Sequence, residues 1–117
     1  MQEKPTQRPT FFVLEIALQA IEALRPVAAR ILTCDRELGE QLRDALSSVV
    51  LNIGEGNRSQ GRLRVTRFST AAGSANESRV ALRAAVAWRY VEASDVQAGE
   101  ELLDRVCAML WRLGARR

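Results

Sequence analysis

Apolar residues recur along this chain at alternating spacings of three and four, which is the period of an amphipathic helix. The first run predicts a helix from Thr10, a candidate cap, to about Leu32. Pro26 lies inside it and is expected to kink the helix or to split it near Leu24, because proline removes a backbone hydrogen bond and clashes with the preceding turn. The stripe predicted to face the core consists of Phe11, Leu14, Leu18, Ile21, Ala28 and Ile31.

A second helix is predicted from about Arg36 to Glu55, with Asp35 as its candidate cap. Gly56 is expected to end this helix, since glycine adopts the left-handed conformation at little cost. The stripe of the second helix includes one polar residue among the apolar ones: Leu38, Leu42, Ala45, Val49 and Asn52.

A turn-rich connector, residues 57–61, precedes a third helix, which is predicted from about Arg62 to Val91 with Ser59 as its candidate cap. Arg79 falls on its stripe and is expected to pair with Glu55 or with another subunit. That stripe consists of Phe68, Ala72, Ala75, Arg79, Leu82 and Val86.

A capping box predicts the start of the fourth helix, with Ser94 at the cap and Gln97 three residues later. The helix is expected to run to about Leu113, where Gly114 ends it. Its main stripe consists of Leu103, Val106, Leu110 and Leu113.

Four amphipathic helices with short links predict an all-α fold, an antiparallel up-down-up-down four-helix bundle. Residues 1–9 are expected to form a flexible tail, and residues 10–117 a single domain. The apolar stripes are wider than one intramolecular core requires. This width indicates a further helix face buried against another subunit, and hence a homo-oligomer.

The amino-acid composition limits the kinds of catalytic and metal-binding site that the chain can form. The net charge is +3 and there is no histidine, which removes the commonest general base and metal ligand. Cys34 and Cys107 are isolated, so no metal site and no cofactor are expected. No apolar run approaches the ~18 residues that span a bilayer, and the N-terminus does not resemble a signal peptide. The sequence therefore predicts a cytoplasmic protein without a membrane partner.

Two groups of polar residues stand out. From residue 58 to residue 67 there are four arginines and no acid, namely Arg58, Arg62, Arg64 and Arg67; dense positive charge of this kind suits phosphate binding. The alternative is an ordinary solvated helix start, or pairing with acids of a neighbour (Glu100, Glu101, Asp104).

The second group is Asn52, Glu55, Ser74 and Glu77, on or beside apolar faces. Buried polar groups need partners, so these four predict either a structural polar lock between two helices or a functional site.

Two motifs carry a family resemblance. The segment Ser48-Val-Val-Leu-Asn52-Ile-Gly-Glu-Gly56, followed by Ser59 and then by Ala71-Ala-Gly-Ser-Ala-Asn-Glu77, resembles the 23S rRNA-intervening-sequence proteins. Their usual pattern is close to Ser-x-Pro-x-Asn-Ile-Ala-Glu-Gly, then Ala-x-Gly-Ser-x-x-Glu. The chain differs from that pattern at Val50, where proline is usual, and at Gly54, where alanine is usual. At Arg62 and Arg79 it has arginine where these proteins often have an acid.

The resemblance implies a left-handed four-helix bundle, a ring-shaped homopentamer and no enzymatic activity. It also relates the chain to the accessory proteins of diversity-generating retroelements, in which a basic pentamer binds reverse transcriptase and nucleic acid. The two departures at Arg62 and Arg79 replace negative charge by positive charge, so an intersubunit ion pair cannot simply be carried over.

Three function classes follow. The first is a non-enzymatic oligomeric scaffold or accessory that binds RNA or DNA through a basic ring of the four arginines. The second is a protein-interaction scaffold that docks a partner such as a polymerase or reverse transcriptase, through Trp88, Tyr90 or Trp111, unless these pack in the core or against a subunit. The third is an enzyme. A carboxylate pair of Glu55 and Glu77 would need Glu-x-x-His repeats to hold two metals, and the serines have no histidine base, so catalysis is not expected.

Overall fold

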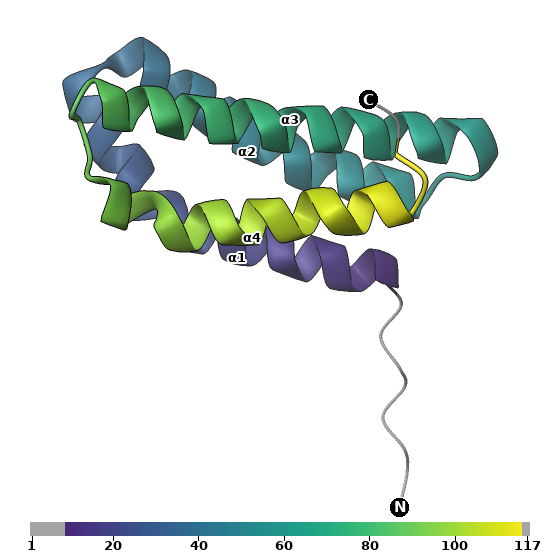
Figure 1. Ribbon diagram of the computed structural model, residues 1–117. Coiled ribbons are helices and arrows are strands. Elements are labelled where there is room, and N and C mark those ends of the chain that lie inside the picture. The colour runs from purple at the N-terminus through teal and green to yellow at the C-terminus, as the bar shows by residue number, and fades with distance from the viewer. Residues whose placement is uncertain (1–8, 116–117) are drawn as a thin grey trace, which may run out of the picture.

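A computed structural model describes residues 9–115, which form four α-helices and no strand (Figure 1). Each of α1 and α3 packs against both α2 and α4, as in an up-down-up-down arrangement. The predicted all-α four-helix bundle is confirmed, while most of the tail predicted for residues 1–9 lies outside the described residues. The helices are α1 (Pro9–Cys34), α2 (Arg36–Asn57), α3 (Gly61–Ala87) and α4 (Ala93–Arg112).

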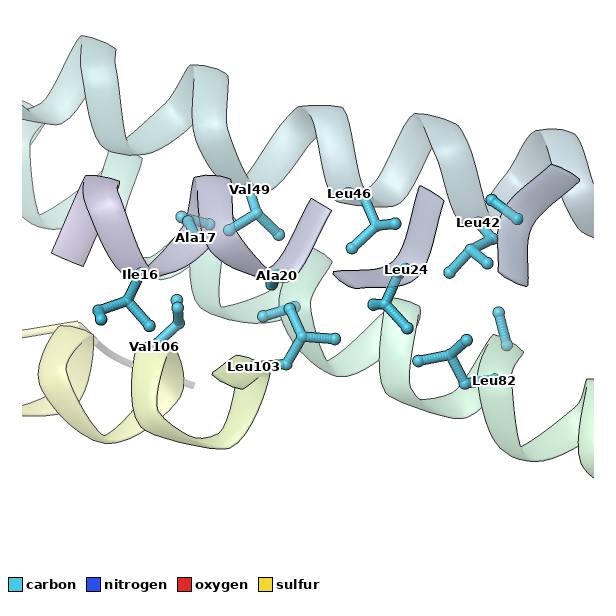
Figure 2. Packing of buried hydrophobic residues seen from close by; sticks show 14 of the residues in the cluster. Ile16, Ala17, Ala20, Leu24, Leu42, Leu46, Val49, Leu82, Leu103 and Val106 are labelled. Carbon is cyan, nitrogen blue, oxygen red and sulfur yellow. The ribbon is translucent and has the colours of Figure 1, made fainter. Parts of the chain in front are cut away.

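The core lies between the four helices and is almost entirely aliphatic. Its largest fully buried side chains include one aromatic residue, Phe68, and several leucines. Small alanines on α1 and α3 allow the helices to approach closely. Figure 2 shows side chains of all four helices meeting in this interior, among them Ile16, Leu24, Leu46, Leu82 and Leu103.

The first helix differs from its prediction in two ways. It begins at Pro9 rather than after a Thr10 cap, and it runs through Pro26 without the predicted split. Proline suits the first turn of a helix because its missing N–H has no helical partner there. At Pro26 a single lost backbone bond is outweighed, since Leu24 and Val27 are buried on either side of it and packing holds both halves in line.

The buried face of α1 is also rotated from the predicted stripe. Phe11 and Leu18 are 48% and 40% exposed, and only Ala28 and Ile31 of the predicted stripe are fully buried. The helix is apolar on two faces, so periodicity alone cannot select the one that packs. The face that packs contains the small residues Ala17 and Ala20; in full it consists of Val13, Ile16, Ala17, Ala20, Leu24, Val27, Ala28 and Ile31.

The cap of α2 is as predicted, because Asp35 accepts a hydrogen bond from the Leu38 backbone N–H (3.1 Å). The predicted end is wrong, since the helix continues past Gly56 to Asn57. Gly56 has a packing role instead: a Cβ built on it would overlap the Phe68 ring. The glycine is therefore the residue that lets α2 lie directly against α3.

The caps of α3 and α4 differ from the prediction. Ser59 donates back to the Glu55 carbonyl oxygen (2.8 Å), and Gln60 precedes the helix without a side-chain cap. At α4 the capping box lies two residues earlier than Ser94 and Gln97: Glu92 is the cap, and its backbone N–H donates to Asp95 Oδ2 (2.9 Å). Asp95 is favoured over Gln97 as the second residue of the capping box, because a carboxylate at the third helical position also interacts favourably with the helix dipole.

The third helix ends at Ala87 rather than Val91, and the turn after it is tied to the rest of the bundle. Arg89 takes a left-handed φ of 64°, and the Tyr90 N–H then donates to the Ala85 carbonyl oxygen (2.9 Å). The Tyr90 hydroxyl donates to Asp35 Oδ2 (3.1 Å), and Arg30 Nε donates to the Tyr90 carbonyl oxygen (3.3 Å). These bonds join the α3–α4 turn to the α1–α2 turn.

This contact makes a pH-dependent contribution that can be measured directly, because Tyr90 is the only tyrosine in the chain. Partial desolvation, and then the hydrogen bond and negative charge of Asp35, raise the pKa of Tyr90 above its ordinary value of 10.0. A folded-state pKa above the unfolded value stabilises the fold below about pH 10, and this stabilisation is lost as the pH rises through the folded pKa. Alkaline titration of tyrosinate absorbance should therefore give a midpoint above 10.0.

Asp35→Asn is the matched control for that titration. Asparagine caps helices as well as aspartate does, so the α2 cap is retained while the charge beside Tyr90 is removed. The titration midpoint should fall toward the ordinary tyrosine value. An unchanged midpoint in this variant would show that Asp35 does not act on Tyr90 in solution.

Candidate functional site

The four predicted arginines lie together where α2 gives way to α3, at the end of the bundle that also holds the start of α1 and the end of α4 (Figure 1). Arg58 is the C-terminal cap residue of α2, and its backbone N–H bonds to the Glu55 carbonyl oxygen (3.1 Å). The other three occupy the first two turns of α3. We call Arg58, Arg62, Arg64 and Arg67 the arginine cluster.

Phe68 anchors this end of the bundle. Its side chain is fully buried between α2 and α3, against the backbone of Gly56. The guanidinium carbon of Arg64 lies 5.0 Å from the centre of the Phe68 ring, a cation–π geometry. Arg64 is thereby held half-buried, while the other three members of the cluster are exposed.

No member of the arginine cluster forms an ion pair in the described part of the chain. Within residues 9–115, neither of the two ion pairs, Arg36–Glu40 and Arg79–Asp104, involves a member of the cluster. The first turn of α3 contains no acid, so no carboxylate of that turn offsets the arginines beside it. This end of the bundle therefore carries a concentrated positive potential that suits phosphate groups.

The second predicted group is only partly brought together. Asn52 Nδ2 donates hydrogen bonds to the carbonyl oxygen of Ser48 (2.9 Å) and to the hydroxyl of Ser48 (3.1 Å). A hydrogen bond of 2.7 Å between the Ser48 and Ser74 hydroxyls links α2 to α3. Ser74 is buried and Asn52 half-buried. Glu55 and Glu77 are both exposed and lie outside this network.

Ser48 belongs to this network, although it is not among the four predicted residues. Its position one turn before Asn52 is the signal that could have identified it, since residues four apart share a helix face. Ser78 extends the network, because its hydroxyl donates a hydrogen bond to the Ser74 carbonyl oxygen (2.9 Å). The hydrogen bonds among these side chains are what a structural role requires.

Within the chain, Arg79 pairs with Asp104 and not with Glu55. Its guanidinium lies 3.4 Å from an Asp104 carboxylate oxygen on α4, and its pairing with another subunit stays a prediction. The reason is geometric, because Arg79 is on the side of α3 that faces α4. The Asp104 side chain is largely exposed, so this pair adds little to stability.

The aromatic residues considered for docking lie at opposite ends of the bundle. Trp88 is 69% exposed and its ring stacks on that of Tyr90, with centroids 6.3 Å apart. Trp111, at the end of α4, is 57% exposed. Neither tryptophan is part of the core, which leaves surface roles open for both.

Residues 9–115 contain no group of three or more histidine, cysteine, aspartate or glutamate side chains placed to bind a metal ion. Over the same range, none of the helices combines the length and the apolar character needed to cross a bilayer.

Comparison with known proteins adds a family and a fold. The chain's sequence matches the family described as 23S rRNA-intervening sequence protein over residues 15–112. No curated protein matches it. Its fold is similar to a crystal structure of a protein with unknown function from the S23 ribosomal protein family of Bacteroides thetaiotaomicron VPI-5482. The TM-score is 0.76 at 17% identity, over 91% of this chain and 97% of that chain, a likeness that concerns the fold alone.

Proposed function

The chain belongs to the family of 23S rRNA-intervening sequence proteins, and we propose that it is a non-enzymatic oligomeric scaffold that associates with nucleic acid. The observation that carries this proposal is the arginine cluster, four guanidinium groups at one end of the bundle without an acidic partner in residues 9–115. Guanidinium groups bind phosphate oxygens in a bidentate manner, and backbone phosphates are the common feature of RNA and DNA.

Self-association would multiply this cluster. The outer face of α1 keeps large apolar side chains exposed, including Phe11, Phe12 and Leu18, which supports a contact with further copies. In a homopentameric ring, each copy would add its four arginines to one basic rim. Binding at several points of one nucleic-acid strand would then raise the overall affinity beyond that of a single cluster.

The experiment is native mass and binding measured at two salt concentrations, with and without a mixed pool of RNA and single-stranded DNA. Counterion release gives a slope of log K against log salt of about −0.7 for each phosphate contacted on a single strand. Four contacts per copy therefore predict a slope of about −3 or steeper. A pentamer that binds no nucleic acid at low salt would contradict the proposal.

One observation favours a second candidate, a scaffold that docks a protein such as a reverse transcriptase without touching nucleic acid. Trp88 is exposed at the end of the bundle opposite the arginine cluster, stacked on Tyr90, which Asp35 holds in place. Exposed, well-supported tryptophans are typical anchors of protein interfaces. A pentamer indifferent to nucleic acid, but retained by a partner protein only when Trp88 is present, would favour this candidate.

A further inference from the structure

A groove runs between α3 and α4 on the surface of the bundle. It has a volume of about 440 Å³, and its lining residues within 9–115 include no aspartate or glutamate. Its floor is made by small and polar residues of α3, and its wall by the last turns of α4. The residues that matter here are Ala72, Gly73, Asn76 and Arg79 of α3 and Trp111 of α4.

Gly73 opens the floor of this groove without serving the packing of the chain. It is in the interior of α3, where glycine is less favourable than alanine by about 1 kcal/mol. A Cβ built on Gly73 would meet nothing within 4 Å, in contrast to Gly56 and Gly99, where a Cβ would overlap a core side chain. The absence of a side chain at Gly73 thus leaves room for something outside the chain to approach the helix closely.

The groove lies next to the arginine cluster. Arg62 is seven residues before Ser69, which lines the groove, so the two share a face of α3. On the other helix, exposed Arg112 follows Trp111 directly. A Cβ built on Gly114 would be 3.9 Å from the Val65 side chain, so the end of α4 abuts the first turns of α3.

We propose that this groove binds single-stranded nucleic acid, with a base stacked on Trp111 and the flanking phosphates on Arg62 and Arg112. The inference rests on the proposed function and deepens it, because it names the strand form and the surface. Aromatic side chains stack on any base with a free face, and only unpaired strands offer such faces. Phe68, the aromatic residue beside the arginine cluster, is buried, so the fold supplies an exposed aromatic group in Trp111.

Charge limits the site to one half of the α3–α4 surface. Beyond the Arg79–Asp104 pair, the surface between these helices is lined by further acids, Glu100 and Glu101. These carboxylates repel phosphate, so a strand is confined to the half that holds Trp111. The other exposed tryptophan, Trp88, does not line this groove.

The test compares a single-stranded oligonucleotide with a duplex of the same length, each titrated against the full chain. Trp111→Ala is expected to weaken single-strand binding by roughly 5- to 150-fold, the range measured for loss of one stacking contact. Duplex affinity should change less than about twofold, because the arginine cluster remains. Trp111→Phe should recover most of the single-strand affinity, since phenylalanine also stacks.

Trp88→Ala is the matched control, because Trp88 is the more exposed tryptophan and lies at the opposite end of the bundle; this variant should leave both affinities unchanged. Because the chain has two tryptophans, Trp88→Phe leaves Trp111 as the sole indole fluorophore. Its fluorescence should be quenched by the single strand and not by the duplex. This readout leaves Trp111 itself unchanged and needs only that Trp88→Phe folds, as the exposed position of Trp88 favours.

The outcomes separate this inference from the proposed function. Nucleic acid bound equally by wild type and Trp111→Ala, with no quenching, would overturn the groove and leave the arginine cluster in place. Failure of wild type to bind either strand form would overturn both. A lower native mass of Trp111→Ala without nucleic acid would show that a second copy covers the groove, which also overturns the inference.

Discussion

Replacing all four residues of the arginine cluster with glutamate is expected to lower nucleic-acid affinity by more than about a thousandfold. Hydrogen bonds to charged groups contribute roughly 1.5–3 kcal/mol each, and 1.4 kcal/mol corresponds to a factor of ten. The new carboxylates also repel phosphate. The measurement is a binding titration with RNA and single-stranded DNA at low salt, where the wild-type affinity is highest.

The fold of this variant should survive. The cation–π contact of Arg64 with Phe68 is lost, which costs about 0.5–1 kcal/mol. Acidic residues in the first turn of α3 interact favourably with the helix dipole, by a similar amount. The free energy of unfolding should therefore stay within about 1 kcal/mol of wild type, as measured by chemical denaturation.

A second quadruple variant controls for net charge. Arg25, Arg43, Arg83 and Arg105 are all exposed and lie away from the α2–α3 turn. Changing these four to glutamate gives the same net charge as the cluster variant, yet it should retain most of the affinity. If both variants lose binding equally, the attraction is a property of the whole chain and the cluster is not a site.

The helices and their order were predictable because each one carries its own local period of apolar residues. The choice of buried face was not predictable where a helix is apolar on two sides, as α1 is at Phe11 and Leu18. Caps were predictable where one candidate was present, as at Asp35, and wrong where several polar residues competed, as between Glu92 and Ser94. Local pattern decides the element, and tertiary packing decides its face and its ends.

The same distinction applies to the candidate site. The arginine cluster is contiguous in sequence, so composition alone locates it. The contact between Ser48 and Ser74, the pairing of Arg79 with Asp104, and the position of Trp111 beside α3 all join distant segments. The spacing of residues along one helix does not predict contacts between segments so far apart in the sequence. The oligomeric state and the nucleic-acid partner remain predictions for the same reason, since both depend on surfaces meeting other molecules.

Phe68 connects the core to the arginine cluster, and its replacement is the stability change with the largest expected effect. Phe68→Ala removes a fully buried ring and should lower the free energy of unfolding by about 3–5 kcal/mol, through lost burial and the cavity that remains. Chemical denaturation measures this directly. Trp88→Ala removes a larger but exposed ring and should cost less than about 1 kcal/mol, so equal losses would show that Phe68 is not buried in solution.

Gly56 allows the contact itself to be tested. A Cβ on this residue would overlap the Phe68 ring, so Gly56→Ala alone should destabilise the fold by about 1–3 kcal/mol, despite the better helix propensity of alanine. In the Phe68→Ala background the ring is gone, and the same change should become neutral or stabilising. A double-mutant cycle isolates this coupling. Additive effects would mean that α2 and α3 are not in contact at this position, and that the arginine cluster lacks the rigid base on which its four charges are held together.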